Sequence, residues 1–188
     1  MPEALESLQQ IYQDYFLLGA AVSSKTLCTS EELILKHFGS ITAENAMKFG
    51  RIHPASDRYD FREADAIVDF ARTHGKQIRG HTLVWHNQVP DWVFLDDDGC
   101  PVSRGELLER MQSHIYTVMG RYRGHIDAWD VVNEAIEDRG SSYLRQSKWL
   151  QIIGPDYVAR AFEFAHAADP EAVLLYNDYN ETNSVKRQ

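Results

Sequence analysis

The sequence DAWDVVNE, residues 127–134, is a short apolar run that ends in an amide and a carboxylate, Asn133 and Glu134. Short apolar runs of this kind are typical of strands buried in a parallel sheet. At the carboxyl end of such a strand, burial can raise the pKa of a glutamate toward that of a working general acid. Neighbouring residues of a regular strand face opposite sides. We therefore expect the strand to end or bulge here, so that both side chains reach one ligand.

Runs of similar character recur along the chain and predict five strands in all. They span residues 16–22, 40–44, 77–85, 126–133 and 173–177. Segments with apolar residues at helical spacing lie between them, around residues 33–38, 64–71, 108–122 and 158–165. Strands that alternate with helices imply right-handed crossovers and a parallel sheet, so the predicted fold class is α/β. No linker divides the chain, which predicts a single domain over residues 1–188.

Two short patterns predict where helices begin. Thr29 with Glu32, and Ser103 with Glu106, match the capping box, in which a hydroxyl and a carboxylate satisfy free amides of the first turn. We therefore expect one helix to start after Thr29 and another after Ser103.

Composition and charge exclude several classes of partner. With 188 residues, 44% of them hydrophobic, the chain is long enough for one sizeable core. Its formal net charge of -9 would repel phosphate backbones and anionic lipids, so we expect a neutral or cationic ligand and neither a nucleic-acid nor a membrane partner. The first residues do not resemble a secretory signal, and no run approaches the ~20 apolar residues of a bilayer span. Both observations predict a cytoplasmic protein.

Residues that could bind a ligand follow the predicted strands at one end of the sheet. They are Glu44, Asn45 and Lys48 after the second strand, Trp85, His86 and Asn87 after the third, Asn133 and Glu134 at the end of the fourth, and Asp178, Tyr179 and Asn180 after the fifth. His81 lies within the third strand. Ligands of barrels and open parallel sheets bind at the carboxyl ends of strands, so we expect these side chains to form one site.

Each part of this set also has a plainer interpretation. Glu44, Asn45 and Lys48 could hydrogen-bond several hydroxyl groups in fixed orientation, but the same run fits a helix start with solvated charges. Trp85 and Tyr179 could stack on the apolar face of a sugar ring, or serve only as packing residues. A lone histidine within a strand is more often a hydrogen-bonded core residue than a ligand-binding one.

A metal site is the competing interpretation of His81, His86, His53 and Asp178. His81 and His86 are five residues apart, so they face opposite sides of a regular strand. No HxH or HExxH spacing occurs, and Cys28 and Cys100 lack the paired spacing of a metal or redox site. We therefore expect neither a metal nor another cofactor.

Four motifs, in order and spacing, resemble those of family 10 glycoside hydrolases, the endo-1,4-β-xylanases built on a (β/α)8 barrel. They are TAENAMKF (residues 42–49), RGHTLVWHNQVPDW (79–92), WDVVNEAIED (129–138) and LLYNDYN (174–180). The resemblance runs from about residue 16 to residue 181. It implies a TIM barrel of which this chain holds about the first five βα units.

The resemblance also implies roles for the site residues. Glu134 corresponds to the general acid/base of a retaining hydrolysis, and Asn133 to the residue that binds the 2-hydroxyl of the sugar at the cleavage site. Glu44, Asn45, Lys48, His81 and Trp85 match residues that bind the glycone side, and Tyr179 looks like the aglycone-side stacking residue. The implied substrate is xylan or a xylooligosaccharide, with no cofactor. The acidic N-terminus looks more like that of the intracellular members.

The family completes its site with a nucleophilic glutamate on the seventh strand, beyond the five strands predicted here. A complete barrel of this type needs ~250 residues. We therefore expect an N-terminal part of a xylanase, which becomes active with a C-terminal barrel fragment or associates with itself. Two alternatives are an inactive remnant that binds xylooligosaccharides and an inverting enzyme that uses Glu44. Two strand spacings put Glu44 and Glu134 ~9 to 10 Å apart, close to inverting geometry.

Overall fold

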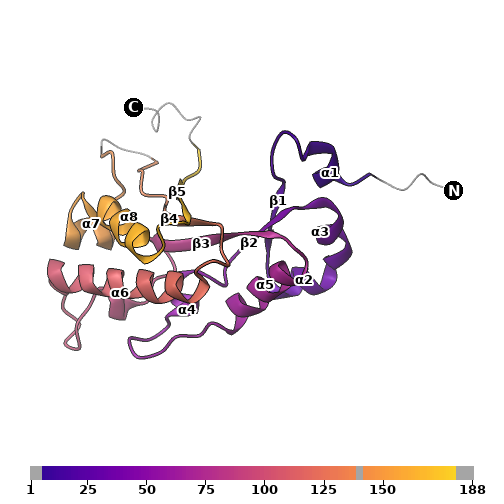
Figure 1. Ribbon diagram of the computed structural model, residues 1–188. Helices are drawn as coiled ribbons and strands as arrows, with labels where there is room; N and C mark the ends of the chain where they lie inside the picture. The colour runs from indigo at the N-terminus through magenta and orange to yellow at the C-terminus, as the bar shows by residue number, and fades with distance from the viewer. Residues whose placement is uncertain (1–5, 139–141, 181–188) are drawn as a thin grey trace.

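The computed structural model describes residues 6–138 and 142–180, in which five strands form one parallel sheet (Figure 1). The strands are β1 (Gly19–Val22), β2 (Ser40–Ala43), β3 (Gln77–Trp85), β4 (Ala128–Asn133) and β5 (Val173–Asn177). Each strand pairs in parallel with the next one in sequence, so their spatial order is β1-β2-β3-β4-β5. The predicted parallel α/β sheet is confirmed. The first strand is shorter than predicted. It begins at Gly19 and not at Phe16, which is exposed.

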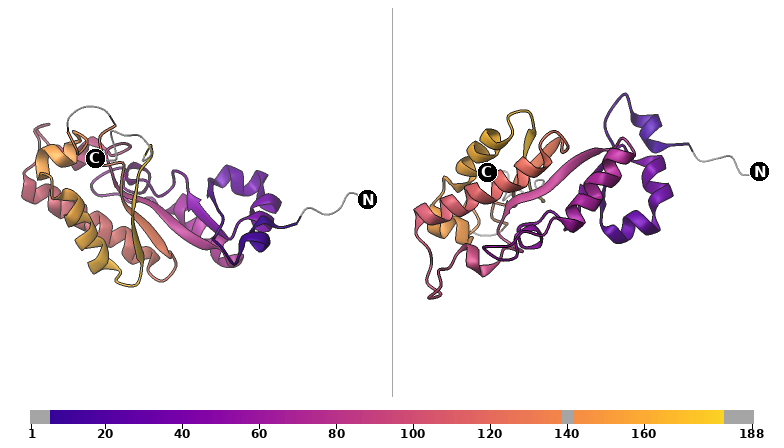
Figure 2. Two further views of the ribbon diagram at one scale, coloured as in Figure 1. Left: turned by 90° about the horizontal axis from the view of Figure 1, so that it is seen from above. Right: turned by 60° about the horizontal axis from the view of Figure 1, so that its bottom comes forward.

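The three longest helices pack on the sheet and bury its apolar side chains (Figure 2). These helices are α5 (Arg62–Thr73), α6 (Arg104–Tyr122) and α8 (Tyr157–Ala168). The remaining helices are shorter. They are α1 (Leu8–Tyr12), α2 (Ser24–Thr29), α3 (Glu31–His37), α4 (Phe49–Ile52), the 3-10 helix η1 (Asp91–Val93) and α7 (Lys148–Ile153). In the described ranges, no helix combines the length and the apolar character that crossing a bilayer requires.

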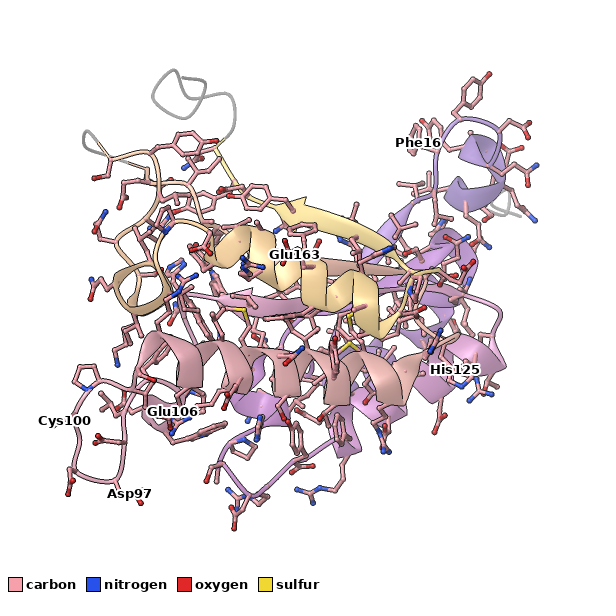
Figure 3. The ribbon with its side chains drawn as sticks, turned by 60° about the vertical axis from the view of Figure 1, so that its left-hand side comes forward. Phe16, Asp97, Cys100, Glu106, His125 and Glu163 are labelled. Carbon is pink, nitrogen blue, oxygen red and sulfur yellow. The ribbon has the colours of Figure 1, made fainter. Side chains whose placement is uncertain are left out.

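The start of α6 follows the prediction made for Ser103, but only the hydroxyl half of the capping box is present, because the Glu106 carboxylate pairs with Arg110. The Ser103 hydroxyl oxygen accepts a hydrogen bond from the backbone amide of Glu106 at 3.2 Å, and α6 begins at the next residue, Arg104. Figure 3 shows Glu106 at this end of the helix, beside the loop that carries Asp97 and Cys100. Both cysteines, Cys28 and Cys100, are exposed free thiols.

The capping box predicted at Thr29 is wrong. Thr29 is the last residue of α2, and its hydroxyl donates to the carbonyl oxygen of Lys25 at 3.1 Å. The capping box of this region lies earlier, where Ser23 and Thr26 bond reciprocally to each other's backbone amides. Residues 23–30 contain several serines and threonines, so the local pattern offers more than one possible helix start.

A cluster of aromatic rings fixes α4, the short helix whose N-cap residue is Lys48. Phe49 stacks on His114 of α6 with ring centroids 3.6 Å apart, and His53 stacks on Tyr59 at 3.8 Å. Burial lowers the pKa of both histidines, so their rings pack as neutral aromatic groups. Through these contacts α6 holds α4 in place, and with it the candidate site residue Lys48.

Strands β3 and β4 approach closely at Gly80. This glycine lies between Arg79 and His81, and the ring of Trp129 in β4 covers it. A Cβ atom at residue 80 would come within 2.2 Å of the Trp129 ring, which is itself buried. The spacing of the two central strands therefore requires a residue without a side chain at this position.

Replacement of Gly80 by alanine is expected to lower the free energy of unfolding by about 1–3 kcal/mol, the usual cost of overpacking a core. Gly120→Ala is the matched control, because Gly120 is an exposed residue of α6 where a new Cβ would meet no atom within 4 Å. That control should gain about 0.5–1 kcal/mol, since alanine is the better helix former. Denaturant unfolding of both variants checks the pair. Wild-type stability of Gly80→Ala would contradict the packing argument.

Candidate active site

The backbone leaves the sheet at Glu134. Strand β4 ends at Asn133, and Glu134 adopts a left-handed conformation with φ of 54°. Its amide donates to the carbonyl oxygen of Asn177 at 2.8 Å, and its own carbonyl oxygen accepts from Arg145 Nε at 3.0 Å. The prediction that the strand ends or bulges at this point is confirmed. The turn lets Asn133 and Glu134 both approach Trp85 rather than point to opposite sides.

Trp85, the last residue of β3, makes the central contact of the site. Its indole N–H donates to Glu134 Oε2 at 2.9 Å. The Lys48 ammonium lies 4.7 Å from the centre of the Trp85 ring, within the range of a cation–π interaction. One indole therefore contacts a carboxylate with its edge and a cation with its face.

The residues after β2 reach the same place. Lys48 Nζ donates to Asn45 Oδ1 at 2.9 Å. Burial lowers the pKa of Lys48, while the nearby carboxylates of Glu44 and Glu134 act in the opposite direction. Since both carboxylates act on one ammonium, the structure brings Glu44, Asn45, Lys48, Trp85 and Glu134 into one polar cluster at the carboxyl ends of β2, β3 and β4.

His81 lies deeper in the sheet, next to a buried carboxylate. Its Nδ1 lies 2.8 Å from Asp130 Oδ2, and Asp130 also accepts two hydrogen bonds from Arg79. The β3–β4 register shifts between His81 and Val84, and the His81–Thr82 peptide bond is cis. The sequence interpretation singled out His81 but passed over Arg79 and Asp130. Asp130, a charged residue inside the apolar run WDVV, could have indicated this pair, because a buried charge needs a partner.

Tyr179 lies at the other margin, after β5, and is exposed. Its hydroxyl donates to Asp138 Oδ2, and this hydrogen bond is the main cause that raises the pKa of Tyr179. Arg145 contacts both residues, with Nη2 at 2.9 Å from Asp138 Oδ2 and at 3.4 Å from the Tyr179 hydroxyl oxygen. Arg145 thus ties the Glu134 turn to Tyr179. No sequence pattern identified Arg145, because an arginine in a loop is usually a solvated surface charge.

The alternative metal set is not assembled. His53 belongs to the aromatic cluster around α4, where its Nδ1 faces His114 Nδ1 at 3.4 Å. His86 is exposed beside the Glu134 turn, and partial desolvation, followed by the charge of Arg145, lowers its pKa. Across residues 6–138 and 142–180, no three His, Cys, Asp or Glu side chains lie close enough together to hold a metal ion.

The sequence profile of Glycosyl hydrolase family 10 matches residues 7–188. The chain belongs to this family. It is 53% identical over 188 residues to endo-1,4-beta-xylanase B of Paenibacillus barcinonensis and 50% identical over 190 residues to an endo-1,4-beta-xylanase of Geobacillus stearothermophilus. Each alignment covers 100% of this chain and 57% of the relative. The chain therefore spans little more than half the length of these curated family 10 relatives.

Solved family 10 structures have the same fold. Xylanase XynB from Paenibacillus barcinonensis, complexed with a conduramine derivative, superposes with a TM-score of 0.95 at 54% identity, over 97% of this chain and 55% of that one. An intracellular xylanase from Thermoanaerobacterium saccharolyticum gives a TM-score of 0.91 at 47% identity, over 97% and 59%. The family domain is a (β/α)8 barrel. The five parallel strands described here match about five of its eight units.

The Trp85–Glu134 contact can be tested without substrate. Trp85→Phe keeps an aromatic face for Lys48 but removes the N–H that stabilises the charged carboxylate. We expect Trp85→Phe to lower the free energy of unfolding by about 1–2 kcal/mol more than Trp92→Phe does, because it leaves a carboxylate oxygen of Glu134 without its donor. Trp92→Phe is the matched control, since its indole nitrogen has no hydrogen-bond partner in the described residues. Denaturant unfolding measures both variants, and equal losses of stability would refute the contact.

Proposed function

We propose that this chain forms part of an endo-1,4-β-xylanase that hydrolyses β-1,4-xylosidic bonds with retention of configuration. One observation carries the proposal. A carboxylate at the carboxyl end of β4, Glu134, is held at 2.9 Å by the Trp85 indole, beside Lys48. Family membership and the names of the relatives, which are endo-1,4-beta-xylanases, support the substrate class.

In this mechanism Glu134 first protonates the leaving glycosidic oxygen. It then acts as a base toward the water that releases the sugar from a covalent intermediate. That intermediate requires a second carboxylate about 5–5.5 Å away. Glu44 follows β2, and β3 separates β2 from β4, so two strand spacings of ~4.8 Å leave it too distant for this step. We therefore assign the nucleophile to a later strand of the family barrel.

The remaining predicted site residues would hold the sugar chain. Asn133 and His81 are assigned to the reacting sugar, and Glu44, Asn45 and Lys48 to sugars farther along the glycone side. Tyr179 offers an exposed ring next to the Glu134 turn, suited to stacking on the aglycone side. A neutral xylan chain or xylooligosaccharide agrees with the net charge of -9, which disfavours polyanions.

Glu134→Ala separates the acid role from a structural one. In a protein that joins this chain to the later strands of the barrel, the variant should lose activity on xylan by at least about 100-fold, the contribution expected of a general acid. Cleavage of an aryl xyloside with an acidic phenol leaving group should fall far less, because that group needs little protonation. Reducing-end and phenol-release assays measure the two rates.

Glu163→Ala is the control for this experiment. Glu163 lies on α8, where it pairs with Arg160 at the surface, and the variant should retain both activities (Figure 3). The chain without the later strands should release no reducing ends from xylan, because it lacks the assigned nucleophile. Equal losses on xylan and aryl xyloside in Glu134→Ala would remove Glu134 from the acid role.

We also propose that the protein acts in the cytoplasm on short oligosaccharides. The support is the relative from Thermoanaerobacterium saccharolyticum, which is described as an intracellular xylanase and is 47% identical to this chain. Fractionation of the source cells with an antibody against the chain checks this location. Recovery of the protein mainly from the culture medium would overturn it.

A further inference from the structure

Arg79 links strands β3, β4 and β5. Its Nε and Nη2 donate to Asp130 Oδ1 of β4 at 3.0 and 2.6 Å. Its Nη2 also donates to Asn177 Oδ1 of β5 at 3.0 Å. One guanidinium in β3 therefore contacts an acidic side chain on the neighbouring strand β4 and an amide side chain on the strand beyond it, β5.

The Arg79 contact determines how Asp130 meets His81. The Asp130 side chain is 2% exposed, so its carboxylate needs compensation for the loss of water. Arg79 supplies a positive charge at Oδ1, while Oδ2 lies 2.8 Å from His81 Nδ1. An ionised carboxylate only accepts hydrogen bonds, so Nδ1 of His81 must carry a proton.

The same guanidinium sets the direction of a second chain of hydrogen bonds. Because Arg79 only donates, the atom of Asn177 that faces it must be the amide oxygen. The Asn177 NH2 group is then the atom that meets Asn133, and it donates to Asn133 Oδ1 at 2.8 Å. The NH2 group of Asn133 then lies 3.2 Å from Trp85 Nε1, on the same side as the Glu134 carboxylate.

The amide of Asn133 has a competing orientation. If it were turned over, its oxygen would accept from Trp85 Nε1 at 3.2 Å, and its NH2 group would donate to the backbone carbonyl oxygen of Asn177 at 3.3 Å. The turned amide would place two NH2 groups opposite each other, at 2.8 Å, unless Asn177 also turned. Asn177 cannot turn without bringing its own NH2 group against Arg79. The Trp85 N–H, moreover, already donates to Glu134.

We propose that Arg79 is a positioning residue, which fixes His81 through Asp130 and directs the NH2 group of Asn133 toward substrate through Asn177. Arg79 needs no contact with substrate for this role. The proposal rests on the proposed function only in assigning Asn133 and His81 to sugar binding. The hydrogen-bond arrangement itself can be measured on the chain without any sugar.

The first test follows the Nδ1–H proton of His81 by proton and nitrogen NMR at a single pH. In Arg79→Met the buried Asp130 carboxylate loses its arginine partner and holds the ring less firmly, so this proton should exchange with solvent about tenfold faster than in the unchanged chain. Arg79→Lys keeps the charge and should restore slow exchange. Arg104→Met, which removes an arginine paired with Asp156 at the surface, should leave the exchange rate unchanged. A wild-type exchange rate in Arg79→Met overturns the proposal.

The second test uses Asn177→Asp, which keeps a partner for Arg79 but provides no donor for Asn133. The Asn133 amide should then turn its NH2 group toward the introduced carboxylate, so that its oxygen faces Trp85 Nε1 and no NH2 group remains on the side of Glu134. We expect xylotriose to bind about tenfold more weakly by calorimetry, the effect of losing one good hydrogen bond. Unchanged affinity in Asn177→Asp overturns the assignment of amide direction, even where Arg79→Met fails to fold.

The positioning role and the sugar-binding role can fail separately. If the unchanged chain does not bind xylotriose, the sugar-binding role proposed for this site is lost. The exchange rate of the His81 Nδ1–H proton in Arg79→Met and Arg79→Lys still decides whether Arg79 controls the Asp130–His81 pair. If xylotriose binds the unchanged chain and Arg79→Met equally well and the exchange rate does not change, the positioning role is wrong and the proposed function stands.

Discussion

The hydrogen bond from the Trp85 indole to the Glu134 carboxylate holds the site together, because it joins the ends of two neighbouring strands. This hydrogen bond forms because the backbone of Glu134 adopts the left-handed conformation, which brings the Glu134 side chain beside Trp85. The other face of the same ring contacts Lys48. A carboxylate, an indole and an ammonium therefore share one small region without a metal ligand set among the described residues.

The surrounding fold keeps these groups in place from both sides of β3. On one side, stacking between Phe49 and His114 anchors α4 and the Lys48 cap to α6. On the other, Gly80 lets Trp129 lie directly against the strand, so β3 and β4 stay close at the point where Arg79 and His81 project to the opposite face. Alternate residues of the same strands thus face the helices, where they make apolar contacts, and the site, where they make polar contacts.

Within the site, charge and hydrogen-bond direction are set by residues behind those expected to touch sugar. Arg79 compensates the buried Asp130 carboxylate and faces the oxygen of Asn177. Those two contacts leave the second nitrogen of His81 for a ligand and turn the NH2 group of Asn133 toward the side of Trp85 and Glu134. Preorganised donors of this kind are effective because they need not reorient when substrate binds. The family 10 relationship gives this arrangement its chemical setting.

The order of the strands, the parallel sheet and the residues at the strand ends followed from the chain alone, because periodicity and strand-end position are local properties. Local pattern could not choose between Thr29 and Ser30 as the N-cap residue of α3, since both carry hydroxyls just before that helix. It also could not show that Arg145 holds the Glu134 turn, or that Arg79 reaches both Asp130 and Asn177. These contacts join residues far apart in sequence. Their distances and hydrogen-bond directions are fixed only when the strands pair in register and the helices pack against them.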